Sequence, residues 1–286
     1  MVNTLTRVAV ITTALSVLLP CAPAKAQALA TPSPTTPSST TDVLDDARHL
    51  FYSGRYEASA ARALEVRTLE PGNLDASELR ASALHFQIRR ALGEPQDRDN
   101  AWKACAECQR LTSVFLEELA VGQTAARARV MRDATDDDAL FFLGKIDLNY
   151  VWLQLATIGK KTGWKEYWEA RRSLDAVLKR QPGHIRAQVA RAWIDYIVDT
   201  RMPFGTSGLL GGGNKKRGLS TVRDAAVRTD LPRYVKAEAM FALWDMHVRE
   251  KAFAEAVVTA RALSQNFPDN VDLVKFIATH EQRATP

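Results

Sequence analysis

The stretch YEASAARALEVRTLEPGN at residues 56–73 has two counterparts farther along the chain, YWEARRSLDAVLKRQPGH at 167–184 and FAEAVVTARALSQNFPDN at 253–270. Each stretch begins with an aromatic residue, has a small residue three positions later and reaches a proline fifteen positions after the aromatic. Apolar residues recur between these points at intervals of three and four, which predicts a helix with one buried face. A proline cannot continue a helix, so we expect each helix to end just before it.

The small residues of the three stretches are Ser59, Ala170 and Ala256. A small side chain lets the two helices of a pair approach closely, and the preceding aromatic fills the space beside the contact. This pattern resembles the second half of the tetratricopeptide repeat (TPR), a helix–turn–helix unit of about 34 residues. The resemblance implies an all-α fold, namely a right-handed α-solenoid of TPR-like helix hairpins with a concave partner-binding surface.

The rest of the chain has room for more units of this kind. Pro71 and Pro182 are 111 positions apart, which allows about three units between them and about five helix pairs in all. Residues 74–92, 99–131 and 136–158 also carry apolar residues at spacings of three and four, so each is predicted to be a helix. No stretch alternates apolar and polar residues between turns, and we therefore expect no strands.

Three consecutive acids, Asp136 to Asp138, lie at the start of the last of these helices. We expect them to cap it, because carboxylates accept the free N–H groups of a helix start. A calcium loop would need acidic ligands at alternating positions and a glycine, so calcium binding is not predicted.

The first 26 residues have the layout of a secretory signal peptide. Arg7 supplies a positive charge, VAVITTALSVLL at residues 8–19 is the apolar run, and Ala24-Lys25-Ala26 offers small residues to a signal peptidase. The run is shorter than the roughly 20 residues of a membrane span. A proline precedes Cys21 where a lipoprotein has a small residue. We therefore predict cleavage after Ala26 and a periplasmic mature protein.

Residues 27–41 are rich in Ser, Thr and Pro and carry no charge, so they are predicted to form a flexible linker. The TPR-like domain is expected over residues 42–286, with Asp42 capping its first helix. Loss of the signal removes two of the 38 basic residues and leaves 36 against 33 acidic ones, a net charge near +3. This balance argues against nucleic-acid binding, and no later apolar run is long enough for a membrane span.

Motifs of common catalytic and cofactor sites are missing. The five histidines include no pair spaced for metal hydrolysis, and no Gly-x-Ser-x-Gly stretch occurs. The glycine-rich segment Gly208–Gly218 departs from a nucleotide-binding P-loop, because its lysine comes one residue late and no Ser or Thr follows. We therefore expect a protein that is not an enzyme and needs no cofactor or metal.

We expect residues 200–213 to be a loop between helices, with Asn214 capping the next helix. An anion would fit at that helix start beside Lys215 and Lys216, since free N–H groups point there. The segment also resembles a group of exported bacterial TPR proteins, in which a Gly-Gly-Asn or Gly-Gly-Asp turn, a basic stretch and Gly-Leu separate two repeats. The residues that carry this likeness are Tyr196, Pro203, Gly212-Gly213-Asn214, Gly218-Leu219 and Ala225-Ala226.

Cys105 and Cys108 form a Cys-x-x-Cys pair, which suits a disulfide, a metal or redox chemistry. Haem attachment would need a histidine where Gln109 stands, and zinc would need further cysteine ligands. A thioredoxin-like site would need a strand before the helix, whereas the surrounding AWKACAECQRL predicts plain helix. We expect structural thiols or a local disulfide.

On the helix that follows Gly163, one stripe contains Trp164, Trp168, Arg171 and Asp175. Such a stripe normally packs on the next repeat, so we expect it to be buried there. Trp and Arg are also favoured anchors of binding surfaces, which is the functional alternative. Our candidates for binding are Trp164, Trp168, Arg171, Lys215 and Lys216.

Three functions fit these features. The leading one is an exported scaffold that binds a peptide or protein partner in an open polar groove, with a small-molecule ligand as a further option. The second is a periplasmic solute-binding accessory subunit of a transporter or envelope-assembly complex, which predicts an apolar pocket near Trp164, Trp168 and the 200–213 loop. The third is a redox protein that uses Cys105 and Cys108.

Overall fold

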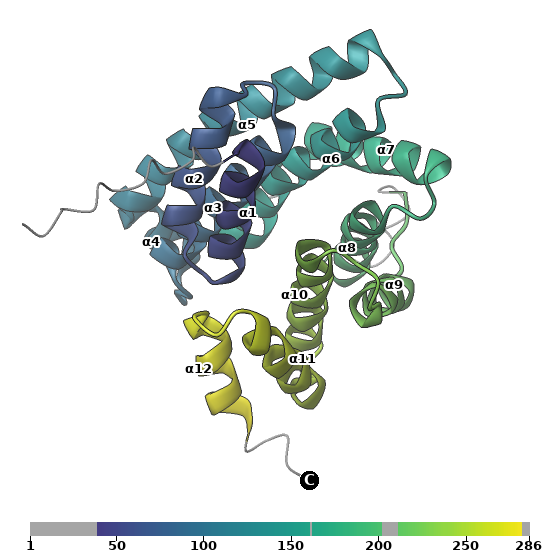
Figure 1. Ribbon diagram of the computed structural model, residues 1–286. Helices are drawn as coiled ribbons and strands as arrows, with labels where there is room; N and C mark the ends of the chain where they lie inside the picture. Colours follow the sequence, from purple (N-terminus) through teal and green to yellow (C-terminus); the bar gives the residue numbers. More distant parts are fainter. Residues whose placement is uncertain (1–38, 161, 202–210, 282–286) are drawn as a thin grey trace, which may run out of the picture. The chain divides into compact units, whose positions relative to one another are not determined.

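The computed structural model describes residues 39–160, 162–201 and 211–281, without the side chain of Arg201. Within these ranges every regular element is a helix and none is a strand, so the predicted all-α fold is confirmed (Figure 1). The signal peptide predicted at residues 1–26 and nearly all of the predicted linker lie outside the described residues.

Ten of the described helices form five consecutive hairpins, the number that the repeat period predicted. The first helices of the hairpins are α1 (Thr40–Tyr52), α3 (Leu74–Leu92), α6 (Asp137–Trp152), α8 (Ile185–Arg201) and α10 (Arg233–Arg249). The second helices are α2 (Tyr56–Leu69), α5 (Ala106–Arg132), α7 (Trp164–Arg180), α9 (Lys215–Val227) and α11 (Phe253–Asn266). Each second helix also packs on the first helix of the next hairpin, and α12 (Val271–His280) packs on α11. The hairpins form a TPR-like helical solenoid.

The three repeated stretches have the structure that the sequence predicts. Helices α2, α7 and α11 each end two residues before the proline. Ser59, Ala170 and Ala256 are completely buried, and the Ser59 hydroxyl donates to the backbone oxygen of Ala47 on α1 at 2.8 Å. A larger side chain at these positions would meet the neighbouring helix, so the small residue is a packing requirement.

Ser39, rather than the predicted Asp42, caps the first helix. The Ser39 hydroxyl accepts from the backbone N–H of Asp42 (3.1 Å), and the Asp42 carboxylate accepts from the backbone N–H of Ser39 (3.2 Å). This reciprocal pair is a capping box, in which the acid is the third helical residue. The predicted caps Asp136 and Asn214 are confirmed, since each side chain accepts from the backbone N–H three residues later.

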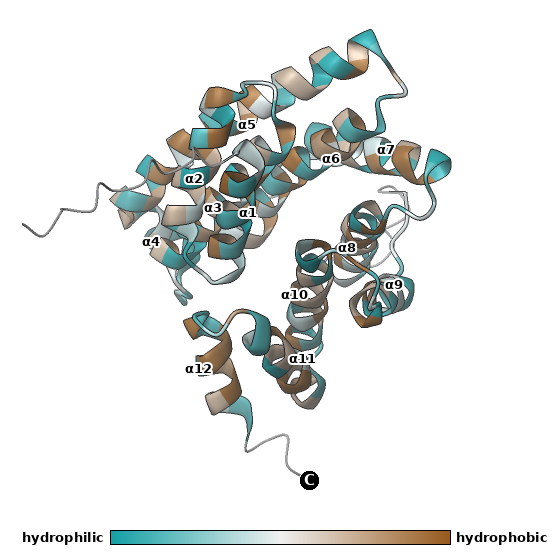
Figure 2. Ribbon diagram, viewed as in Figure 1, coloured by the Kyte–Doolittle hydropathy of each residue, from teal (hydrophilic) through white to brown (hydrophobic). Residues whose placement is uncertain are grey.

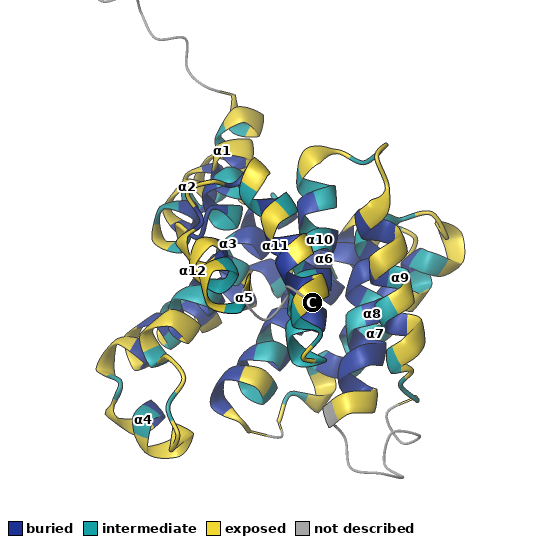
Figure 3. Ribbon diagram, turned by 90° about the horizontal axis from the view of Figure 1, so that it is seen from below, coloured by how far each residue is buried: buried dark blue, intermediate teal, exposed yellow. Residues whose placement is uncertain are grey.

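The single helix predicted over residues 99–131 is wrong. The structure has α4 (Arg98–Ala104) and α5 instead, and the two meet at Cys105, whose backbone angles are not helical (φ −85°, ψ 88°). Trp102 on α4 is buried in the largest hydrophobic cluster, while most of α4 is exposed (Figure 3). The break at Cys105 accompanies the burial of Trp102, and the local spacing of apolar residues indicates neither of them.

The helix predicted over residues 136–158 changes character before its end. Helix α6 stops at Trp152, and a π-helical turn, η1 (Leu153–Ile158), continues it as far as Gly159, whose φ is +84°. The wider turn places Thr157 in the interior, where its hydroxyl hydrogen-bonds the ring of His85 at 2.9 Å. The buried hydroxyl of Thr157 is therefore hydrogen-bonded within the core.

Gly213 and Gly218 allow α9 to lie close against α8. A Cβ atom on Gly218 would lie 2.6 Å from the backbone oxygen of Ala192, and one on Gly213 would lie 2.5 Å from the backbone nitrogen of Asp199. Both distances are shorter than a van der Waals contact, so a larger residue would separate the two helices. These two glycines are therefore packing residues. Residues 202–210 of the predicted loop lie outside the described residues.

Apolar and polar side chains alternate around most helices, and the apolar ones gather where helices meet (Figure 2). The largest buried cluster extends from α2 to α8, and a second one joins α8, α9 and α10. Helix α8 contributes Ile194 to the first cluster and Tyr196 to the second. It is therefore the element through which the two clusters meet.

Candidate functional site

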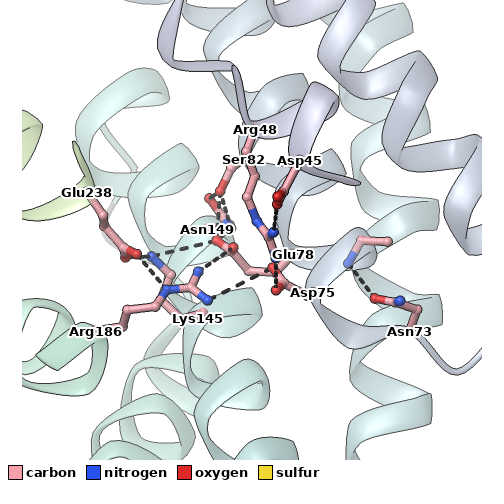
Figure 4. A network of polar contacts seen from close by, with 11 residues as sticks. Asp45, Arg48, Asn73, Asp75, Glu78, Ser82, Lys145, Asn149, Arg186 and Glu238 are labelled. Atoms are coloured by element: carbon pink, nitrogen blue, oxygen red, sulfur yellow. Dashed lines mark hydrogen bonds and ion pairs between the residues drawn. The ribbon is translucent and has the colours of Figure 1, made fainter. Parts of the chain in front are cut away.

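Charged side chains from the first helices of all five hairpins meet in one place (Figure 4). We call them the first-helix network: Arg48 on α1, Asp75 and Glu78 on α3, Lys145 on α6, Arg186 on α8 and Glu238 on α10. These six residues are three carboxylates and three cations. Asp45 on α1, whose side chain is 52% exposed, is a further carboxylate that pairs with Arg48 at 2.5 Å. We did not predict it from the sequence, because its members are far apart in the chain and belong to no motif.

Arg186 occupies the centre of the network. Its guanidinium nitrogens lie 2.7 Å from a carboxylate oxygen of Glu238, 3.6 Å from one of Glu78 and 4.0 Å from one of Asp75. The guanidinium also lies over the ring of Phe141 on α6, 4.9 Å from its centre. One side chain on α8 therefore links α3, α6 and α10.

Lys145 makes the second central connection. Its ammonium lies 2.5 Å from a carboxylate oxygen of Glu238 and 3.7 Å from one of Glu78. One turn later on α6, the side-chain amide of Asn149 donates to the hydroxyl of Ser82 on α3 at 3.1 Å. Through Lys145 and Asn149, one face of α6 therefore makes ion pairs with α3 and α10 and a hydrogen bond with α3.

Burial and opposite charge act against each other in this network. Burial alone would raise the pKa of Glu238, but the ammonium of Lys145 and the guanidinium of Arg186 outweigh it and lower that pKa to about 2. Burial would lower the pKa of Lys145, but the carboxylates of Glu238 and Glu78 outweigh it and raise that pKa. Lys145 and Glu238 are therefore charged at neutral pH although their side chains are only 19% and 13% exposed.

Aromatic rings beside the network join the first hairpin to the last. The ring centre of Tyr52, at the end of α1, lies 5.4 Å from that of Phe241 and 5.5 Å from that of Phe267. The side-chain amide of Asn270 donates to the backbone oxygen of Tyr52 at 2.7 Å, while its oxygen caps α12. The sequence predicts an open polar groove without placing it on particular helices. In the structure the protein's own side chains occupy the face that the first helices form.

An open cleft lies between α7, α8 and α9, with a volume of about 620 Å³. Within it Arg191 pairs with Asp175 at 2.6 Å and with Asp195 at 2.5 Å, and Arg217 pairs with Asp195 at 2.6 Å. We call it the α7–α9 cleft, after the three helices. The residues that line it include Asp175, Leu178, Ile185, Arg191, Asp195 and Arg217. We did not predict this site. The sequence indicates only one of its ion pairs, since Arg191 and Asp195 are four positions apart on a single helix.

The candidate residues on α7 lie beside the glycine turn that precedes α9. Arg171 donates to the two backbone oxygens of the Gly211-Gly212 turn, at 2.5 and 3.3 Å. Trp168 packs against the largest hydrophobic cluster, and Trp164 is 40% exposed. Asp175 lies one turn after Arg171, at 3.9 Å from its guanidinium, and lines the α7–α9 cleft. The predicted stripe therefore continues into the cleft.

Lys215 and Lys216 lie at the start of α9, where the sequence suggested an anion site. The Lys215 ammonium pairs with Glu250 at 2.7 Å, and its backbone N–H donates to the Asp199 carboxylate, also at 2.7 Å. Asn214 caps the same turn. The carboxylate of Asp199 is therefore the anion at this helix start, and Asn214 is its cap. The Lys216 side chain is exposed to solvent.

The solute-binding alternative predicted an apolar pocket near Trp164, Trp168 and the 200–213 loop, and a small apolar pocket does lie beside Trp164. Trp152, Trp164, Tyr167 and Ile194 are among the residues that line it. Its volume is about 10 Å³, which is room for roughly one water molecule. This size does not favour the binding of a solute there.

Asp147 on α6 and Glu169 on α7 form a carboxyl pair. Asp147 is completely buried and accepts from the side-chain amide of Gln123 at 2.7 Å. Burial and the nearby charge of Glu169 raise the pKa of Asp147 to about 8, whereas the hydrogen bond from Arg127 lowers the pKa of Glu169. The pair therefore shares one proton at neutral pH, held on Asp147. Because Asp147 has no exposed surface, its role is structural.

Cys105 and Cys108 are joined by a disulfide at the junction of α4 and α5. In the part of the chain that the structure describes, no three His, Cys, Asp or Glu side chains are grouped so as to hold a metal ion. None of the described helices combines the length and the apolar character that a membrane crossing requires.

Comparison with known proteins gives few matches. No family model matches the chain, and no curated protein matches it. Among solved structures, a thermophilic TPR protein from Thermus thermophilus is similar, with 14% sequence identity and a TM-score of 0.45. The similarity covers 84% of this chain and 98% of that one.

Replacing Glu238 by Gln should lower the free energy of unfolding by roughly 3–5 kcal/mol at pH 7, because Lys145 and Arg186 lose their shared buried counter-charge. Urea denaturation measures this loss. Since the pKa of Glu238 is lowered from 4.5 to about 2, the stability that its charge contributes is present above pH 4.5 and disappears as the pH falls toward 2. The difference between the two proteins should shrink over that range.

The matched control for this variant is Glu65→Gln. Glu65 pairs with Arg62 at 2.8 Å, but both side chains are about half exposed, so the loss should be much smaller than that of Glu238→Gln. Equal losses for the two variants would show that the first-helix network has no special importance.

Replacing Asp147 by Asn should stabilise the protein at pH 8 relative to pH 4. The folded state holds a proton on Asp147 up to a pH of about 8, whereas the unfolded chain releases it near 3.8, so native stability falls as the pH rises between these values. The Asn amide donates to Glu169 without needing that proton. Melting temperatures at pH 4, 6 and 8 measure the effect, and the exposed Asp224→Asn is the control. A gain that does not grow with pH would contradict the shared proton.

Proposed function

We propose that this chain is an exported, non-enzymatic TPR-like scaffold, and that it binds a peptide or protein partner at the α7–α9 cleft. The observation that carries the proposal is the cleft itself. Its volume of about 620 Å³ lies within the range of roughly 300–1,000 Å³ that is typical of ligand sites, and apolar and charged side chains line it together.

The first-helix network is a poorer place for a partner. Its six charges already compensate one another, and a partner that separated any pair would leave a buried charge without its counter-charge. The α7–α9 cleft has accessible charges instead. The Arg217 side chain is 62% exposed although it pairs with Asp195.

The chemistry of the cleft suits a polypeptide. Leu178 and Ile185 offer apolar contact, while Arg217 and Asp224 present opposite charges. A peptide provides both kinds of group along one chain, and its backbone supplies hydrogen-bonding groups throughout. Arg171 adjoins Asp175 of the cleft, at 3.9 Å from its guanidinium, and so borders the proposed surface. Trp164 and Trp168 lie on the same helix but do not line the cleft.

Export is the second part of the proposal, and it rests on the sequence of the first 26 residues. Cleavage after Ala26 would place the helical domain in the periplasm behind the Ser/Thr/Pro-rich linker. A periplasmic solute-binding accessory subunit is the alternative. The apolar pocket beside Trp164 is too small to support it.

Site-specific photo-crosslinking tests the proposal. A photoreactive amino acid at Thr221, which lines the cleft, should give a discrete crosslinked adduct in cells, because a bound partner lies against it. The same amino acid at Glu65 on α2 is the control and should give none. Asp224→Arg, which reverses an exposed charge at the cleft, should reduce the Thr221 adduct at least threefold. Equal adducts at both positions, or an adduct unaffected by Asp224→Arg, would contradict cleft binding.

A further inference from the structure

The Cys-x-x-Cys pair lies at the start of a long helix, not within one. Cys105 is the N-cap residue of α5, a helix of 27 residues, and its sulfur accepts from the backbone N–H of Cys108 at 3.1 Å. The sequence predicts plain helix on both sides of the pair, whereas the structure breaks the helix at Cys105. The element before α5 is the helix α4 and not the strand of a thioredoxin-like site, so the third function predicted from the sequence has to be judged on the local geometry of the disulfide.

The two cysteines of the disulfide differ in exposure. Cys105 is partly exposed, whereas Cys108 is completely buried in the largest hydrophobic cluster, one turn before Leu111. Attack on a disulfide requires an approach to one of its sulfurs. A thiol arriving from solution therefore meets the sulfur of Cys105.

The surroundings favour Cys105 as a thiolate once the disulfide is open. Free N–H groups at a helix start carry partial positive charge, and such positions stabilise thiolates. The carboxylate of Glu107, between the two cysteines, is engaged by Arg110 at 2.6 Å. The N–H of Cys108 already points at the Cys105 sulfur. The hydrogen bond that would stabilise a Cys105 thiolate is therefore already formed in the disulfide state.

A purely structural purpose explains the disulfide less well. The two cysteines are only three positions apart. Because a disulfide stabilises a fold mainly by closing a loop, and the effect grows with loop length, so short a loop contributes little. The disulfide also lies within the start of α5 and connects no two hairpins.

We propose that Cys105 and Cys108 form a thiol–disulfide exchange site that accepts electrons from a dithiol of a partner protein. A thiolate of the dithiol attacks the Cys105 sulfur, the Cys105–Cys108 bond breaks, and Cys108 takes up a proton as a thiol. The second thiolate of the dithiol then attacks its own first sulfur and releases Cys105 as a thiolate. The dithiol loses two electrons and becomes a disulfide, and the pair in this chain becomes a dithiol.

Two single-thiol variants test this site in the full chain, with Cys21→Ser as background so that no other cysteine reacts. Cys108→Ala leaves Cys105 alone, and Cys105→Ser leaves Cys108 alone while keeping a capping hydroxyl. Oxidised glutathione is the probe, and intact-protein mass spectrometry follows the mixed disulfide. The Cys105 thiol should react at least tenfold faster than the Cys108 thiol under native conditions, while circular dichroism shows equal helix content.

The second arm uses the Cys21→Ser protein with its disulfide intact and dithiothreitol as the dithiol. Reduction without denaturant is the expected result. Equal reactivity of the two single thiols, or a disulfide that dithiothreitol opens only in urea, would overturn the proposal. Because the site lies on α5 and not at the α7–α9 cleft, its failure would leave the proposed scaffold function standing.

Discussion

The buried charges of Lys145, Arg186 and Glu238 have to remain together, because each has left water and only its neighbours compensate for that loss. They come from the third, fourth and fifth hairpins, and Glu78 adds the second one. In most hairpin stacks each unit contacts only the next. Here the network imposes contacts between units that are not neighbours in the chain, and the Tyr52 aromatic contacts add one between the first and the last.

This constraint decides which surfaces remain for a partner. The first-helix face is satisfied by the protein's own side chains, so binding there would have to break ion pairs between helices. The α7–α9 cleft is different, because α9 packs closely on α8 through Gly213 and Gly218 and the cleft lies between that pair and α7. Gly213 and Gly218 belong to the glycine-rich segment that departs from a P-loop, and their role in the structure is to set the position of α9 against α8.

Local rules predicted the local features well. The three prolines end their helices, the small residues lie at helix contacts, and Asp136 and Asn214 cap where they were expected to. Features decided by tertiary burial were missed. The break at Cys105 has no local signal in the sequence. Arg186 and Glu238 have no spacing that distinguishes a buried ion pair from two solvated charges. The α7–α9 cleft was missed for the same reason, since its residues come from three helices.

A double-mutant cycle on Lys145 and Glu238 tests most directly whether the network holds the hairpins together. Lys145→Met, Glu238→Leu and the double variant are compared with the native chain by urea denaturation. The account predicts that the double variant loses at least about 1 kcal/mol less stability than the two single losses combined, because removing both partners leaves no unpaired charge between them. Losses that add to within about 0.5 kcal/mol would contradict it, and would mean that the two charges lie close together without stabilising each other.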